Sequence, residues 1–173
     1  MKKYSAKRVA SLGILLAAAS IVFIIESLVP PLIPIAPYVK LGLANVFVLL
    51  VIIYFGAWDA FLFVLAKNLL TALATLSSFS IVFNLAGSLC AYGVMVGLYA
   101  CVFPRVSIVS VSVIGAVVSN IARTGVAAII MEMPSLYIQL PIVCSFSVLA
   151  GVIVGILVIL CVKHLPERLT NFI

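Results

Sequence analysis

The sequence predicts an all-α membrane protein: one integral membrane domain over residues 1–173, built as a bundle of six transmembrane helices with both termini in the cytoplasm. Hydrophobic residues make up 66% of the chain and charged residues 8%, where a soluble domain carries about 25% charged residues. The mean hydropathy of +1.45 means that lipid must surround most of the chain. At roughly 20 residues a span, the length holds about six spans and no soluble catalytic domain.

Apolar segments, separated by turn residues or charges, are the expected spans. Their predicted bounds are 9–29, 41–56, 58–76, 81–103, 106–130 and 139–162. Basic residues before the first segment also permit a secretory signal, but the apolar run continues through Ile25, which favours an uncleaved span. The first connection, residues 30–37, has four prolines in eight residues and is expected to form a stiff external cap.

Positively charged residues predict the orientation, because cytoplasmic span ends carry an excess of Lys and Arg. One side of the predicted bundle holds seven cations, and the opposite side holds only Lys40. The seven are Lys2, Lys3, Lys7, Arg8, Arg105, Lys163 and Arg168. We therefore expect a multi-pass protein of the cell membrane with cytoplasmic N- and C-termini.

The charges and motifs disfavour several function classes. A net charge of +6 would suggest nucleic acid in a soluble protein, but here the charges follow the topology and no nucleic-acid partner is expected. The four cysteines show no C-x-x-C spacing, and His164 is the single histidine, so no metal site is predicted and no cofactor is expected. Asp59 is the single aspartate, which argues against an aspartate-rich diphosphate and magnesium site. No Walker or hydrolase motif is present, so we expect a protein that is not an enzyme.

Charged and amide side chains within the spans mark the expected binding site, since such residues are costly in lipid and usually functional. Counting about 1.5 Å per residue places Glu26 and Arg123 near the outer face and Lys67 near mid-membrane. The asparagines of the second, fourth and fifth spans also fall in the outer half. The predicted substrate-binding residues are Glu26, Lys40, Asn45, Lys67, Asn68, Thr71, Asn84, Asn120 and Arg123.

This distribution suggests a pocket open to the outside and sealed below. Two stripes at near-helical spacing face it: they are Lys67, Thr71 and Ser78 on the third span, and Ser112, Ala116, Ser119 and Arg123 on the fifth. Three cations against the single acid Glu26 favour an anionic ligand such as a phosphate, diphosphate or carboxylate. Alternatively, Glu26 pairs with Arg123 or Lys67 only to hold helices together, and the asparagines form interhelical hydrogen bonds.

Small residues form a stripe along one face of the first span. They are Ala6, Ala10, Gly13, Ala17 and Ser20, spaced by four, three, four and three residues. Small residues on one face let another helix approach closely. The stripe begins in the cytoplasmic interface, where a partner protein could reach it, and packing within the bundle explains the pattern equally well.

The segment after the proline-rich loop resembles a known family. Val39-Lys40-Leu41-Gly42-Leu43-Ala44-Asn45 is similar to the signature of the Gx transporter family, also called heptaprenyl diphosphate synthase component I. The segments FGAWDA at 55–60 and NLAGS at 84–88 are similar to the same family. That family in turn resembles the S components of energy-coupling-factor (ECF) transporters, six-helix proteins that capture vitamins or their precursors outside and partner a cytoplasmic ATPase module.

The resemblance implies that the small stripe corresponds to the S-component A-x-x-x-A surface, which docks on the scaffold transmembrane subunit. Ala6-x-x-x-Ala10 matches that motif, and Gly13-x-x-x-Ala17 departs from it by one glycine. The expected function is capture of a small anionic vitamin or cofactor-type solute (a flavin, quinone or isoprenoid precursor) for uptake driven by ATP-binding subunits. The alternative is a noncatalytic membrane subunit of a prenyl diphosphate synthase or quinone-pathway complex.

Overall fold

The described part of the chain is helical throughout apart from its turns, and it covers residues 6–28, 42–75, 78–102 and 105–164 of a computed structural model. The helices are α1 (Ala6–Leu28), α2 (Asn45–Phe55), α3 (Ala57–Thr75), α4 (Ser78–Cys101), α5 (Ile108–Ile130), the 3-10 helix η1 (Pro134–Gln139) and α6 (Leu140–His164). The all-α prediction is confirmed, and each predicted span contains one α-helix.

Helix length separates α2 from the helices that could cross a membrane. Within the described ranges, α1, α4, α5 and the continuous unit of η1 and α6 are long and apolar enough to cross a membrane. The 11 residues of α2 rise only about 16 Å, against a hydrocarbon core of about 30 Å. The span predicted over 41–56 is therefore too long. Most residues of α2 are buried, and a helix that is apolar all round because protein surrounds it gives the same sequence signal as one surrounded by lipid.

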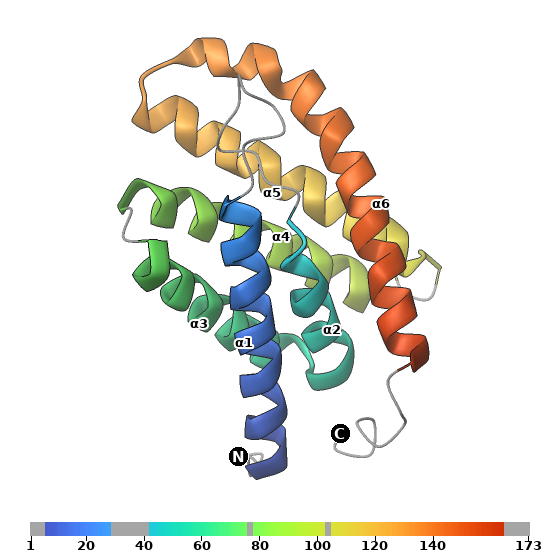
Figure 1. Cartoon of the computed structure of the whole chain (residues 1–173). Helices are drawn as coiled ribbons and strands as arrows, with labels where there is room; N and C mark the ends of the chain where they lie inside the picture. Colours follow the sequence, from blue (N-terminus) through green and yellow to red (C-terminus); the bar gives the residue numbers. More distant parts are fainter. Residues whose placement is uncertain (1–5, 29–41, 76–77, 103–104, 165–173) are drawn as a thin grey trace.

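The helices are arranged so that the start of α1 and the end of α6 lie at the same end of the molecule (Figure 1). In this view α1 passes in front of α3 and α4, and α5 lies between α4 and α6. Helix α5 packs against both α4 and α6, and α1 packs against α3 and α2. An even number of membrane crossings would place both ends of the chain on one side of the membrane.

Helices α5 and α6 approach each other closely because glycines of α6 face the backbone of α5. A Cβ atom on Gly151 would lie 2.5 Å from Cα of Val113, and one on Gly155 would lie 2.7 Å from Cα of Val109. Because the opposing atoms are backbone, no side-chain rotation would relieve these contacts. Gly151 and Gly155 follow Ser147 at intervals of four residues, and all three are buried, as in other small-residue helix interfaces in membranes.

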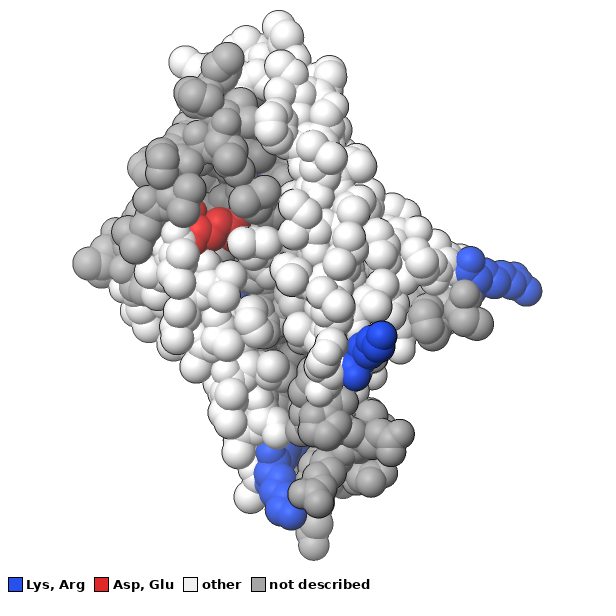
Figure 2. All heavy atoms as spheres, turned by 45° about the vertical axis from the view of Figure 1, so that its right-hand side comes forward, with Lys and Arg blue, Asp and Glu red and all other residues white. Residues whose placement is uncertain are grey.

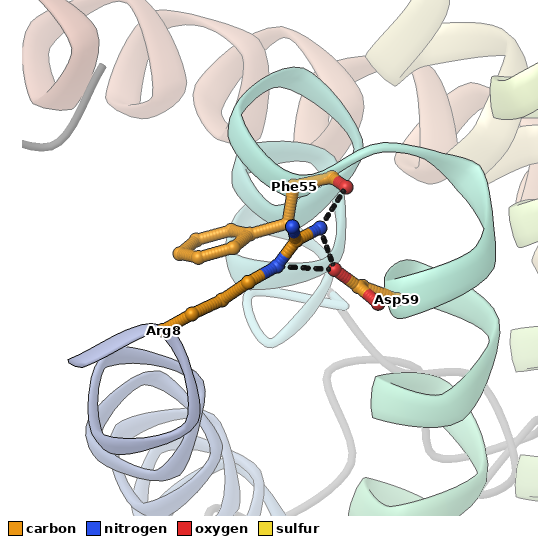
Figure 3. A network of polar contacts seen from close by, with 3 residues as sticks. All are labelled: Arg8, Phe55 and Asp59. Carbon is orange, nitrogen blue, oxygen red and sulfur yellow. Dashed lines mark hydrogen bonds and ion pairs between the residues drawn. The ribbon is translucent and has the colours of Figure 1, made fainter. Parts of the chain in front are cut away.

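The first turn of α1 is attached to the junction of α2 and α3 by Arg8 (Figure 3). Nε of Arg8 donates to Oδ2 of Asp59 over 2.9 Å, and Nη2 donates to the carbonyl oxygen of Phe55 over 3.0 Å. Nη2 also pairs with Oδ2 of Asp59, and the guanidinium carbon lies 5.8 Å from the Phe55 ring centroid. The φ of 92° at Gly56, which favours glycine, makes the tight junction possible. From sequence, Arg8 contributes only to the predicted topology, whereas the structure gives it a buried acidic partner, Asp59.

The surface is that of a membrane protein. On the face drawn in Figure 2, basic side chains lie toward the lower and right-hand parts, an acidic side chain lies at the upper left, and uncharged residues cover most of the area between them. Large apolar side chains are exposed along the helices, among them Ile14, Leu69, Leu149 and Ile153. Together with the four long apolar helices, this surface indicates a multi-pass membrane protein.

Candidate substrate-binding site

Polar side chains are buried inside the bundle, where each needs a partner to offset its loss of hydration. Lys67 is 1% exposed and Arg123 is 4% exposed. The predicted site residues that are buried are Asn45, Lys67, Asn68, Thr71, Asn84, Asn120 and Arg123. Glu26 is half-buried. Lys40, which was also predicted to bind substrate, lies outside the described residues. The side chain of Ser78, from the predicted stripe of the third span, lies outside them too.

Helices α3 and α4 are joined by a polar contact near the middle of each helix. The hydroxyl of Ser88 donates to Oδ1 of Asn68 over 3.3 Å. Nδ2 of Asn68 donates to the carbonyl oxygen of Val64 over 2.8 Å, which fixes the orientation of the amide. The hydroxyl of Thr71 donates to the Lys67 carbonyl oxygen over 2.9 Å, so Thr71 is satisfied within its own helix.

Helix α5 places Arg123 directly over the backbone of α4 at Gly87. A Cβ atom at position 87 would lie 2.5 Å from Nε and 2.8 Å from Cγ of Arg123, and 3.0 Å from the Ser119 carbonyl oxygen. Glycine is therefore required here so that the guanidinium fits between the two helices. Because Gly87 and Ser88 are consecutive, Arg123 on one side of α4 and Asn68 on the other lie at the same level of that helix.

Helices α5 and α6 are joined one turn before Arg123. Nδ2 of Asn120 donates to the hydroxyl oxygen of Ser147 over 2.8 Å, and the Ser147 hydroxyl donates to the Val143 carbonyl oxygen over 2.6 Å. The hydroxyl of Thr124 donates to the Asn120 carbonyl oxygen over 2.9 Å. We call Asn68, Ser88, Asn120, Arg123 and Ser147 the polar layer, since these residues occupy one level across α3, α4, α5 and α6.

Glu26 connects the end of α1 to the start of α2. Its Oε1 accepts a hydrogen bond of 2.6 Å from the backbone N–H of Gly42. Gly42 has a φ of 74°, a conformation that favours glycine, and Oε1 of Glu26 holds this turn directly. A Cβ atom at position 42 would lie 3.0 Å from Nδ2 of Asn45, so the predicted residue Asn45 packs tightly beneath the same turn.

Glu26 and Arg123 are not joined as the direct pair considered from sequence: within the described residues, Oε2 of Glu26 and Nε and Nη1 of Arg123 are buried without a hydrogen-bond partner. Two strong donors and one strong acceptor thus remain available for a ligand.

Two buried residues of the polar layer, Ser88 and Ser147, were not singled out from sequence. Ser88 follows Asn84 by one helical turn, and that spacing places both on one face of α4. Ser147 lies in an almost wholly apolar helix. Its four-residue spacing with Gly151 and then Gly155 was the sequence pattern that could have indicated its burial. The stripe of Ser112, Ala116, Ser119 and Arg123 on α5, predicted to face inward, is buried as expected.

The small residues of α1 are used differently from those of α6. Ala6, Ala10, Gly13 and Ala17 are exposed, and a Cβ atom on Gly13 would meet no atom within 4 Å. The buried side of α1 instead carries Ala19 and Phe23. Packing inside the bundle is therefore not the role of these four residues in the described structure.

An apolar cavity of about 280 Å³ lies between α1 and α3 beside Gly13. Its lining residues are Val9, Leu12, Gly13 and Leu16 from α1 and Asp59, Leu62, Phe63 and Ala66 from α3. The cavity is distinct from the polar layer. Within the described residues, no group of three or more His, Cys, Asp or Glu side chains could hold a metal ion.

Comparison with solved structures identifies the fold. The chain superposes on the protein described in "Structure and mechanism of the S component of a bacterial ECF transporter" with a TM-score of 0.71, over 96% of both chains and at 23% sequence identity. The chain therefore has the fold of an S component. None of the curated proteins matches.

The family comparison agrees with the resemblance found in the sequence. The sequence model of heptaprenyl diphosphate synthase component I matches residues 15–160, which include α2 to α5 entirely and most of α1 and α6. The chain belongs to the family described as heptaprenyl diphosphate synthase component I.

Proposed function

We propose that this protein is the substrate-binding S component of an ECF-type transporter, which captures a small anionic solute outside the cell for ATP-driven uptake. The S-component fold over 96% of the chain supports this assignment. The observation that carries it is Arg123, a guanidinium 4% exposed whose Nε and Nη1 are unpartnered within the described residues. A charge buried in this way usually marks a substrate pathway in a membrane protein.

The ligand is anionic because the basic groups outnumber the acid. Arg123 and Lys67 are both buried, whereas Glu26 is the single acid among the predicted site residues, and Lys40 would add a further positive charge. The planar guanidinium fits a carboxylate or phosphate. Asn45, Asn68, Asn84, Asn120 and Thr71 would surround the anion with amide and hydroxyl groups.

Energy comes from partner subunits, since the chain has no nucleotide-binding motif. The exposed stripe of Ala6, Ala10, Gly13 and Ala17 on α1 is the proposed docking surface for the scaffold transmembrane subunit, which carries the ATP-binding subunits. Small exposed residues allow a partner helix to approach the α1 backbone closely.

The proposed orientation places both termini in the cytoplasm, with the short helix α2 and the turn before it together counted as one of six passes through the membrane. It predicts that Ser135→Cys, in a background without the four native cysteines, reacts with an impermeant thiol reagent added outside intact cells, whereas Arg105→Cys does not. Both positions are exposed in the structure. Labelling of Arg105→Cys alone would reverse the orientation and place the polar layer nearer the cytoplasm.

The family description favours one other candidate, a noncatalytic subunit of a prenyl diphosphate synthase complex. The two candidates differ in their partners. Affinity purification from the native membrane in mild detergent should recover a scaffold subunit with ATP-binding subunits, and liposomes containing this assembly should take up solute only with ATP. Recovery of an aspartate-rich prenyl synthase without ATP-binding subunits would contradict the transport proposal.

A further inference from the structure

Helix α3 has one exposed face and one buried face. Five exposed large side chains recur at intervals of three or four residues, which places them on one side of the helix. They are Trp58, Leu62, Leu65, Leu69 and Leu73. The opposite side carries Ala60, Val64, Lys67, Asn68 and Thr71, which are all buried. We call the four leucines, which follow Trp58 along α3, the leucine stripe.

The leucine stripe is long enough to extend across most of a bilayer. From Trp58 to Leu73 the chain advances 15 residues, a rise of about 22 Å, against a hydrocarbon core of about 30 Å. A row of exposed leucines is unfavourable in water, because apolar surface gains free energy when it leaves water. Lipid acyl chains cover such a row at no cost, so they are the partner that suits this face of a membrane protein.

Aromatic side chains gather where the stripe begins. Trp58 is 68% exposed, its ring centroid lies 5.9 Å from that of Phe61, and the Phe61 centroid lies 5.8 Å from that of Tyr92 on α4. The Tyr92 hydroxyl donates to the carbonyl oxygen of Ala57 over 2.9 Å, which holds α4 against the first turn of α3. Tryptophan and tyrosine combine an apolar ring with a polar group, and this combination suits the boundary between lipid and water.

The polarity of the chain changes at the same point. Asp59 follows Trp58 and pairs with Arg8 from the first turn of α1. The leucine stripe, which extends away from this ion pair, carries no polar group. Charged groups, then exposed aromatic rings and then an apolar face are the order expected from the headgroups into the hydrocarbon core.

We propose that α3 crosses the membrane with the leucine stripe against lipid acyl chains, and that Trp58, Phe61 and Tyr92 lie among the lipid headgroups. This aromatic group fixes the depth at which the junction of α2 and α3 lies. The inference goes beyond the proposed transport function, and it holds whichever side is the cytoplasm and whichever solute is bound.

The native protein carries its own probe for the test, because Trp58 is the single tryptophan. The purified chain, without partner subunits, is placed in phosphatidylcholine vesicles that carry a nitroxide either on the headgroup or near the end of an acyl chain. The headgroup nitroxide should quench the Trp58 fluorescence about twofold more strongly than the deep nitroxide, or better. Stronger quenching by the deep nitroxide, or quenching by neither, would overturn the proposal.

A matched variant moves the probe along the same face. Leu69 is 64% exposed and lies 11 residues beyond Trp58, about 16 Å further along α3. In Trp58→Phe combined with Leu69→Trp, the deep nitroxide should become the stronger quencher, and Trp58→Phe alone supplies the background. A continued preference for the headgroup nitroxide would mean that α3 lies along the membrane surface, and no quenching would mean that lipid does not cover the stripe. Either result contradicts the proposal and leaves the ATP-driven uptake assay unaffected.

Discussion

Small residues recur every three or four positions on both α1 and α6, yet the two helices use them in opposite ways. On α6, Gly151 and Gly155 face the α5 backbone so closely that a Cβ atom would lie 2.7 Å or less from a Cα atom. On α1, a Cβ atom at Gly13 would meet nothing within 4 Å. The α6 pattern is used inside the chain, whereas the α1 pattern is exposed on the surface of the described structure.

The contrast predicts a large loss of stability on the α6 side. Gly151→Leu should reduce the free energy of unfolding by about 3 kcal/mol or more, because α5 backbone occupies the space and overpacking cannot be relieved. The measurement is thermal unfolding in detergent. Gly93→Leu on α4, where a Cβ atom would meet nothing within 4 Å, is the control. A Gly151→Leu protein as stable as this control would show that the helices do not pack as described.

A change at Arg123, in the polar layer between α4 and α5, should weaken solute binding without an equal loss of stability. Arg123→Gln keeps donors but removes the charge, and it should weaken binding of the solute that co-purifies by about 1.5–3 kcal/mol, the range for a charge-assisted hydrogen bond. Because Nε and Nη1 have no partner within the described residues, the free energy of unfolding should not fall.

The matched experiment combines Arg123→Gln with Glu26→Gln in a double-mutant cycle of affinity and thermal stability. If the two residues only hold helices together, Arg123→Gln destabilises the protein, and the double variant recovers both stability and affinity. Recovered binding in the double variant would remove Arg123 from the site.

The start of α1 is attached to α3 by the ion pair of Arg8 and Asp59, and removing this contact should have a smaller effect. Asp59→Asn weakens the contact with Arg8, whose side chain is 13% exposed. We expect a loss of about 1.5 kcal/mol, the lower end of the range for a hydrogen bond to a charged group, by thermal unfolding. Arg8→Gln should cost a similar amount, and the double variant should lose less than the sum. Additive losses would mean that the pair contributes nothing through its interaction.

The sequence predicted the helices and the buried polar residues well because both signals are local. Apolar runs gave an α-helix within each predicted span, and intramembrane charge identified Arg123 and Lys67 as buried. Helix α2 is shorter than the span predicted over 41–56, because hydropathy does not distinguish a helix surrounded by protein from one surrounded by lipid. The pairing of Arg8 with Asp59 joins residues 51 positions apart, and no sequence spacing reports such a contact. The roles of Gly87 and Ser147 likewise depend on the neighbouring helix.

One matched pair of variants tests whether the exposed stripe on α1 docks the scaffold subunit. Gly13→Leu and Gly93→Leu each place the same side chain where a Cβ atom meets nothing within 4 Å. Each is co-expressed with the scaffold and ATP-binding subunits, and the subunits that co-purify are quantified. Gly13→Leu should lose most of the assembly while Gly93→Leu keeps it, with solute binding retained in both. Full assembly of Gly13→Leu, or equal loss in both variants, would contradict this docking role.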